Sequence, residues 1–158
     1  MFNTHFAKLV ALLFVLGLSG SALADNNYKS IGMCKTDFQT MDWNGGKVTV
    51  GNLKCSVEVS GSSGVVPNGS QIQNCLLRVL RMGEGTEIGT HCNVTDKDGD
   101  ILYSYSERKQ GDIVAGGKGK SKHVGGTGKY RGVSGGCEFT ATYLPENWLK
   151  VESSCHSN

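Results

Sequence analysis

Six cysteines carry the most reactive side chains of the sequence, and their number and spacing favour disulfide bonds. They are Cys34, Cys55, Cys75, Cys92, Cys137 and Cys155. No C-x-x-C pair occurs, and the neighbours His91-Cys92 and Cys155-His156 cannot both reach one metal ion from regular strands. We therefore expect disulfide bonds, and neither a metal ion nor a cofactor.

Three alternating carboxylates offer a second possible site. Asp96, Asp98 and Asp100 have the spacing that begins an EF-hand calcium loop, and Glu107 stands at the twelfth position. Ile101 occupies the place where such a loop needs glycine, and no helices are expected to flank it. An EF-hand is therefore excluded, while calcium binding of low affinity stays an open alternative.

Basic side chains are the remaining candidates for ligand binding. Lys118, Lys120 and Lys122 alternate with small residues, so on a strand the lysines share one face. Such a face is either solvated or an anion site, and Arg78 is a further candidate cation. With 16 Lys+Arg against 14 Asp+Glu in 158 residues, nucleic acid is not expected as the partner. The histidines lie in no recognised nucleophilic arrangement.

The N-terminal segment indicates export. Residues 1–24 have a basic Lys8, an apolar run from Leu9 to Leu18 and a small-x-small ending at Ala24, which are typical of a cleaved signal peptide. Residues 25–158 would form one domain without a transmembrane segment. Because disulfide bonds persist in oxidising compartments, we expect a secreted or periplasmic protein.

Three turn signals arrange the cysteines in pairs. Asn44-Gly45 is a strong two-residue hairpin signal, and segments 82–85 and 145–147 are two further turns. Although six cysteines allow about 15 connectivities, counting outward from each turn places two cysteines opposite each other. The predicted bonds are Cys34–Cys55, Cys75–Cys92 and Cys137–Cys155. We expect Cα separations within about 4.4–6.8 Å.

The same registers oppose other side chains. Favourable cross-strand pairs are Val79–Ile88, Ala141–Val151 and Asp42–Lys47. Lys35 would face Lys54, which is tolerable only on a solvated face. A connection over 60–70, a turn at 96–100 and a glycine-rich strand over 113–124 complete the pattern, and no 3.6-residue apolar period occurs. These elements predict an all-β protein, an antiparallel sandwich or a closed barrel.

Candidate catalytic carboxylates depend on which face the cysteines occupy. Glu58 and Glu138 lie on the strand face opposite the neighbouring cysteine. If the cysteines point inward, both carboxylates face solvent and a catalytic role is improbable. If the disulfides lie outside, both carboxylates line the interior and become candidates for proton transfer. Arg78 follows the same alternative.

A glycine-rich segment carries a resemblance to a known family. The residues are Gly125, Gly126, Thr127, Gly128, Lys129, Tyr130 and, a few positions on, Gly135. This string resembles the strand–turn–strand signature of the allene oxide cyclase and dirigent barrel superfamily. The resemblance implies a single antiparallel barrel of eight strands, often oligomeric, with a cavity for an apolar small molecule.

Three functions remain open at this point. The first is non-catalytic binding of a small apolar or amphipathic ligand, or of a surface partner. The second, implied by the resemblance alone, is an isomerase or cyclase that encloses a reactive intermediate. The third is an interaction protein whose interior is filled. A cavity of about 300 Å³ or more would favour the binder, and a buried carboxylate with a raised pKa would favour the enzyme.

Overall fold

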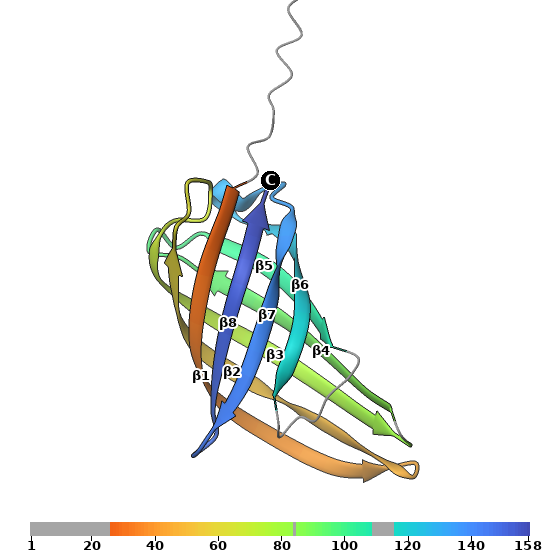
Figure 1. Ribbon diagram of the computed structural model, residues 1–158. Helices are drawn as coiled ribbons and strands as arrows, with labels where there is room; N and C mark the ends of the chain where they lie inside the picture. The colour runs from red at the N-terminus through yellow and green to blue at the C-terminus, as the bar shows by residue number, and fades with distance from the viewer. Residues whose placement is uncertain (1–25, 84, 109–115) are drawn as a thin grey trace, which may run out of the picture.

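The structure is a computed structural model that describes residues 26–158 except 84 and 109–115. Antiparallel strands close into a barrel in the sequence order β1-β2-β3-β4-β5-β6-β7-β8 (Figure 1). The strands are β1 (Asn26–Trp43), β2 (Gly46–Ser60), β3 (Gly69–Met82), β4 (Gly85–Thr95), β5 (Ile101–Arg108), β6 (Gly117–Gly126), β7 (Gly135–Leu144) and β8 (Trp148–Ser157). The all-β barrel is therefore confirmed. The expected signal peptide lies outside the described residues.

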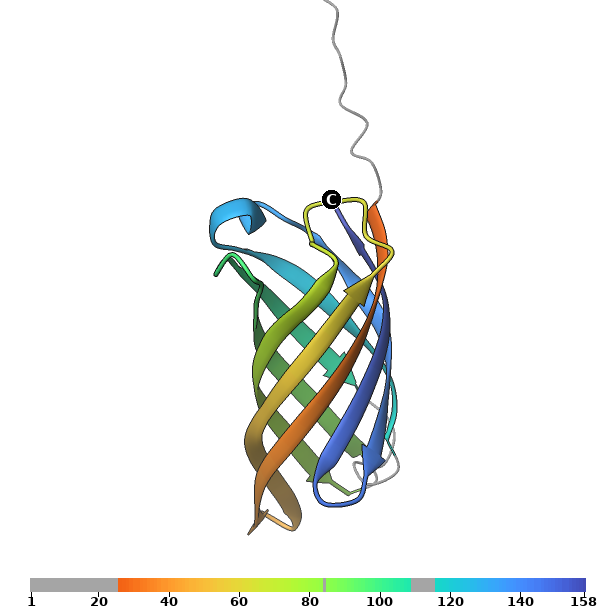
Figure 2. The ribbon, with the colours of Figure 1, turned by 90° about the vertical axis from the view of Figure 1, so that its left-hand side faces the viewer.

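The helical content of the described residues is one 3-10 turn, η1 (Gly128–Tyr130). In the part of the chain that the structure describes, no helix has the length and hydropathy needed to cross a membrane. η1, the connection over 61–68 and the C-terminus lie at one end of the barrel, and the tip of the β1–β2 hairpin lies at the other (Figures 1 and 2).

Local turn chemistry explains two of the hairpins. Asn44 and Gly45 have φ values of 46° and 76°, and Glu146 and Asn147 have φ values of 57° and 60°. Two successive residues with positive φ match the twist of the flanking strands, and asparagine tolerates this conformation better than most residues. Both turns therefore stand where the sequence predicts them, and they set the registers of β1 with β2 and of β7 with β8.

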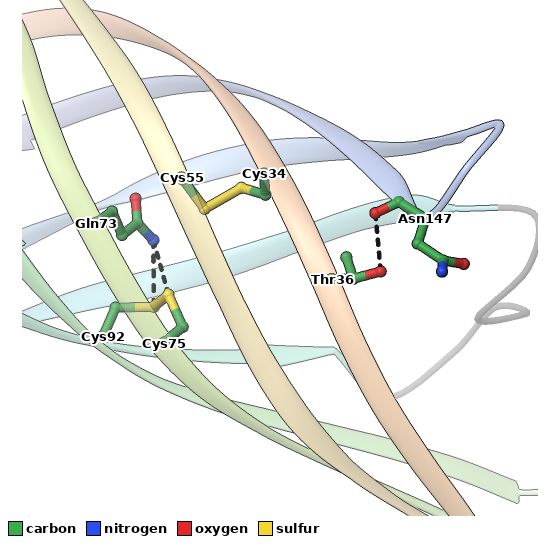
Figure 3. The surroundings of a disulfide bond; sticks show 7 residues. All are labelled: Cys34, Thr36, Cys55, Gln73, Cys75, Cys92 and Asn147. Atoms are coloured by element: carbon green, nitrogen blue, oxygen red, sulfur yellow. Dashed lines mark hydrogen bonds between the residues drawn. A yellow bond between two sulfur atoms is a disulfide. The ribbon is translucent and has the colours of Figure 1, made fainter.

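All three predicted disulfide bonds are confirmed. The Cα–Cα distances are 3.9 Å for Cys34–Cys55, 4.1 Å for Cys75–Cys92 and 4.0 Å for Cys137–Cys155. These distances are shorter than the expected range. Each bond joins residues that lie directly opposite each other on neighbouring antiparallel strands, where the sheet brings the backbones close. Figure 3 shows two of the bonds, Cys34–Cys55 and Cys75–Cys92.

The cysteines point into the barrel, which decides between the two faces left open by the sequence. Along β2, Leu53, Cys55, Val57 and Val59 are buried, while the residues between them are exposed. Five of the six cysteines are only 2–5% exposed, and Cys137 packs against them partly buried. The remaining core is apolar and comes from all parts of the sheet: Leu77, Val79, Ile88, Leu102, Ala141 and Leu149.

The unfavourable pair of lysines lies on the outer face. Lys35 is opposite Lys54 in the β1–β2 register. The Lys35 ammonium donates to the Glu146 carbonyl oxygen at 2.6 Å and lies 5.1 Å from the ring centroid of Trp148. These two contacts of Lys35 bind the turn between β7 and β8 to β1, across the line where the barrel closes.

The glycine-rich strand continues further than the sequence predicts. The sequence predicts a strand over 113–124, and β6 spans Gly117–Gly126; residues 113–115 lie outside the described residues. Gly119 faces the interior, and a Cβ there would collide with the ring of Phe139 on β7. The small inner residues of β6 therefore make room for a bulky side chain of the next strand.

Removing one bridge tests how far the disulfides stabilise the barrel. The double substitution Cys34→Ala/Cys55→Ala opens a loop with a sequence separation of 21 residues. We expect the free energy of unfolding to fall by about 3 kcal/mol, because the unfolded chain regains loop entropy. Urea unfolding followed by circular dichroism measures this change. An unchanged midpoint and slope would contradict the prediction.

Candidate functional site

The interior of the barrel contains a cavity of about 150 Å³. Its wall combines apolar and polar side chains. Apolar side chains line most of it, among them Leu53, Val57, Leu77, Ile88, Leu102 and Leu149. The polar side chains come from several strands: Thr90, Ser104, Ser106, Ser121 and His123 on β4, β5 and β6, the buried Arg108 at the end of β5, and Ser30, Gln71, Gln73 and Ser153 on β1, β3 and β8.

The cavity is suited to a small, mostly apolar molecule that carries a polar group. An apolar cavity of about 150 Å³ is large enough for benzene, whereas drug-sized ligands occupy pockets of about 300–1,000 Å³. The interior is therefore not filled by side chains, but the volume of its cavity is below the roughly 300 Å³ that would favour a ligand binder. A ligand that fits this cavity can be no larger than about one substituted ring.

A buried hydrogen-bonded pair lies in the wall of this cavity. The Tyr28 hydroxyl of β1 is 2.8 Å from Nε2 of His123 on β6, and the two rings are stacked with centroids 6.3 Å apart. Both side chains line the cavity, and their residues are 6% and 8% exposed. The other ring nitrogen, Nδ1 of His123, is buried without a hydrogen-bond partner.

Burial keeps both members of the pair uncharged. Desolvation lowers the pKa of His123 to about 4, with a smaller contribution from the charge of His156. Desolvation also raises the pKa of the Tyr28 hydroxyl. A buried polar group without a partner costs about 1–3 kcal/mol, so Nδ1 of His123 is an unusual feature that calls for an explanation.

The glycine-rich signature forms a second polar cluster, which clamps one end of the barrel. Lys129 Nζ lies 2.8 Å from Asp96 Oδ2, 2.6 Å from Asp98 Oδ2 and 3.8 Å from Asp100 Oδ2. The Tyr130 hydroxyl donates to Asp96 Oδ2 at 2.9 Å. The turn that follows β6 is thereby held to the turn that precedes β5.

Backbone contacts complete this clamp. The Thr127 hydroxyl accepts a hydrogen bond from the Ile101 amide at 2.8 Å, and the Thr127 amide donates to the Ile101 carbonyl at 2.8 Å. Gly128 has a φ of 47°, and a Cβ at this position would overlap the carboxylate of Asp100. The glycine is therefore required both by its backbone conformation and by the approach of the aspartate.

Charge and hydrogen bonding together set the protonation states in the clamp. Burial raises the pKa of Asp96, but hydrogen bonds from Lys129, Tyr130 and the Asp98 amide outweigh it, so the pKa is lowered overall. Hydrogen bonds to Asp96 and Asp98 raise the pKa of Lys129. Burial, followed by the bond to Asp96, raises the pKa of Tyr130. The cluster therefore holds ionised Asp96 against protonated Lys129.

The lysine occupies the place that a calcium ion would need. Its ammonium group lies among the three carboxylates that the sequence offered as a possible calcium loop. Over the described residues, no group of three or more His, Cys, Asp or Glu side chains has an arrangement that could hold a metal ion. The three aspartates thus act as the acceptors of a structural clamp.

The candidate carboxylates lie on the outer face, away from the cavity. Glu58 is exposed and accepts a hydrogen bond from the Ser70 hydroxyl at 2.7 Å. The Glu138 side chain is 76% exposed and lies 3.0 Å from Lys120 Nζ, and its hydrogen bond to Lys120 lowers its pKa. Neither side chain is brought near the Tyr28–His123 pair.

The basic candidates also lie outside and do not form one site. Arg78 on β3 contacts Glu87 at 3.4 Å, while Lys118, Lys120 and Lys122 lie exposed on β6. Strands β3 and β6 are not neighbours in the barrel. The three lysines share one exposed face, as the alternation predicts, and an anion site on that face stays a prediction.

Sequence reasoning missed the Tyr28–His123 pair, although a signal for it existed. His123 continues the alternation of Gly117, Gly119 and Ser121, which places it on the inner face of β6. Tyr28 likewise shares its face with Cys34. The alternation does not predict that these two inner positions meet, because they are 95 residues apart in the chain.

Comparison with known proteins agrees with this geometry at the level of the fold. No family model matches the chain, and no curated protein matches it. A solved structure of the pterocarpan synthase dirigent protein GePTS1 is similar, with a TM-score of 0.52 and 12% sequence identity over 92% of this chain and 98% of that chain. The protein thus has a dirigent-like barrel fold, as the resemblance implied. The likeness to allene oxide cyclases stays a prediction.

Substitution of Tyr130 tests the clamp. Tyr130 is 1% exposed, and Tyr130→Phe removes the hydroxyl that donates to the buried carboxylate of Asp96. We expect the free energy of unfolding to fall by about 2 kcal/mol, as for other hydrogen bonds to charged groups. The control is Tyr103→Phe on an exposed tyrosine of β5. Equal losses in the two variants, measured by urea unfolding, would contradict a clamp.

The buried histidine predicts an acid-dependent loss of stability. In the unfolded chain His123 binds a proton near pH 6.5, but in the folded protein only near pH 4. Stability is therefore complete above pH 6.5 and declines by up to about 3 kcal/mol as the pH falls toward 4. Unfolding at a series of pH values measures the slope. His123→Gln should flatten it, whereas the exposed control His91→Gln should retain it.

Proposed function

We propose that the protein is an exported binding protein that holds a small amphipathic molecule inside its barrel. The observation that carries this proposal is the cavity of about 150 Å³, which is lined mostly by apolar side chains and also by hydroxyl groups and His123. The apolar side chains remove a ring from water, and the polar groups offer it hydrogen bonds. The proposed ligand is a compact, uncharged molecule that contains about one ring.

The disulfides support both parts of this proposal. Three intramolecular bonds are consistent with an oxidising compartment, as is the signal-peptide pattern of residues 1–24. The bonds join β1 to β2, β3 to β4 and β7 to β8, so they hold the cavity walls in place before a ligand arrives. A preformed site binds without a cost for ordering its walls.

The geometry favours binding over catalysis by proton transfer. Among the described residues that line the cavity, Glu107 alone has a carboxylate, and its residue is exposed. Two of the buried side chains that line the cavity, His123 and Tyr28, have titratable groups that are held uncharged. The pterocarpan synthase activity in the name of GePTS1 belongs to that protein, and for this chain an isomerase or cyclase is the alternative that turnover of a bound molecule would support.

Binding of toluene tests the proposal. Toluene has a suitable size and should raise the melting temperature with increasing concentration, because it binds the folded state alone. Ser121→Leu places a larger side chain in the cavity wall and should abolish the effect. The matched control Lys122→Leu introduces the same side chain on the outer face, one residue along β6, and should preserve it.

Two results would overturn this proposal. The first is a wild-type melting temperature that toluene leaves unchanged up to its solubility limit, since the interior would then be closed to ligands as in a purely structural barrel. The second is an equal response of Ser121→Leu and Lys122→Leu, since toluene would then bind elsewhere. Circular dichroism of each variant establishes that the barrel is folded.

A further inference from the structure

Among the described residues that line the cavity, His123 has one buried polar atom whose hydrogen-bonding capacity is unused. Nδ1 of His123 is buried and has no partner, although the ring lines the cavity and its other nitrogen is bonded to Tyr28. His123 is 8% exposed, so bulk solvent does not provide the missing partner. Buried polar groups are nearly always hydrogen-bonded, which makes an orphaned ring nitrogen at a cavity a sign of a ligand contact.

The tautomer of His123 determines what kind of group it seeks. The Tyr28 hydroxyl stays protonated, and Nε2 of His123 is the partner for its proton at 2.8 Å. If Tyr28 donates to Nε2, the neutral ring carries its own proton on Nδ1, and one donor is left over. If Nε2 instead donates to Tyr28, both the Tyr28 proton and the Nδ1 lone pair are left over. The first arrangement satisfies more groups, so Nδ1 is a hydrogen-bond donor.

We propose that His123 Nδ1–H, oriented by Tyr28, selects cavity ligands that carry a hydrogen-bond acceptor such as a ketone or ether oxygen on an apolar ring. This inference rests on the proposed function and specifies the ligand class for the same cavity. His123 is the group that touches the ligand, and Tyr28 is a positioning residue that keeps the proton on Nδ1.

The surroundings of the ring agree with an uncharged acceptor. The cross-strand neighbours of His123 on the inner face are uncharged. Ser104 lies opposite His123, and the disulfide-bonded Cys92 lies opposite Ser104. The titratable groups that act on the ring are Tyr28, its hydrogen-bond partner, and His156, whose charge lowers the pKa of His123. The buried Arg108 also lines the cavity, but it stands four residues along β5 from Ser104, the residue opposite His123, and so belongs to another part of the wall. At Nδ1 itself, a neutral oxygen needs only the single Nδ1–H donor.

A pair of ligands with nearly the same shape tests the proposal. Acetophenone and α-methylstyrene differ in having a carbonyl oxygen or a methylene group at one position. The full-length exported protein should bind acetophenone about tenfold more tightly than α-methylstyrene, which corresponds to one gained hydrogen bond. Binding is measured by titration calorimetry or by ligand-dependent melting.

Two variants assign the preference to the buried pair. Tyr28→Phe/His123→Phe removes both polar groups while keeping two rings in the wall, and it should reduce the preference to about one. The control His91→Phe alters an exposed histidine of β4 and should keep the preference. A double variant that fails to fold leaves the second readout, the ¹⁵N chemical shifts of His123 in the wild-type protein. These should show a proton on Nδ1 and a shift of that nitrogen when acetophenone is added.

The outcomes separate this inference from the proposed function. Equal affinities for the two ligands, or a proton on Nε2 in the free protein, would overturn the role of His123 while leaving the cavity as a binding site. Equal affinities are also expected if a water molecule stays bound to Nδ1 in the complex, and this result too would overturn a direct contact between His123 and the ligand. Binding of neither ligand, together with no response to toluene, would remove the proposed function itself.

Discussion

Register is the constraint on which this barrel depends. Successive residues of a strand point to opposite faces, so a shift by one residue would turn every inner side chain outward. In the β1–β2 hairpin such a shift would bring Lys35 and Lys54 toward the apolar interior in place of Cys34 and Cys55. Because a disulfide joins these opposed cysteines, the alternative register is excluded by a covalent bond as well as by burial.

The sulfur bridges therefore organise the interior as well as strengthen the sheet. Three of the four hairpins formed by β1–β2, β3–β4, β5–β6 and β7–β8 carry a bridge, and all bridge sulfurs belong to residues that line the cavity. The side-chain amide of Gln73 donates to one of these bridges, since its Nε2 lies 3.0 Å from the sulfur of Cys75 and 3.2 Å from that of Cys92 (Figure 3). On the remaining hairpin, the described residues of β5 and β6 contribute serines and His123 to the polar part of the cavity wall.

The two polar clusters differ in how completely they are satisfied. In the clamp, Asp96 receives the Lys129 ammonium, the Tyr130 hydroxyl and backbone amides, so its charge is compensated although its side chain is fully buried. In the cavity, the Tyr28–His123 pair uses one ring nitrogen and leaves the other unbonded. A satisfied network stabilises the fold, while a partly satisfied one next to empty space is suited to a ligand. This contrast supports a structural role for the signature and the proposed binding role of the cavity.

The sequence by itself determined what depends on neighbours within one hairpin. The residues Asn44-Gly45 predict a turn because both adopt positive φ, and the pairing of Cys34 with Cys55 follows by counting outward from it. Contacts between distant strands required the closed barrel. Closure decided that the cysteine face is the inner one, and it brought Tyr28 to His123 and Lys129 to Asp96 across 95 and 33 residues respectively. Side-chain alternation assigns each of these residues to a face, but the tilt and closure of the sheet decide which of them meet, and no local pattern encodes that geometry.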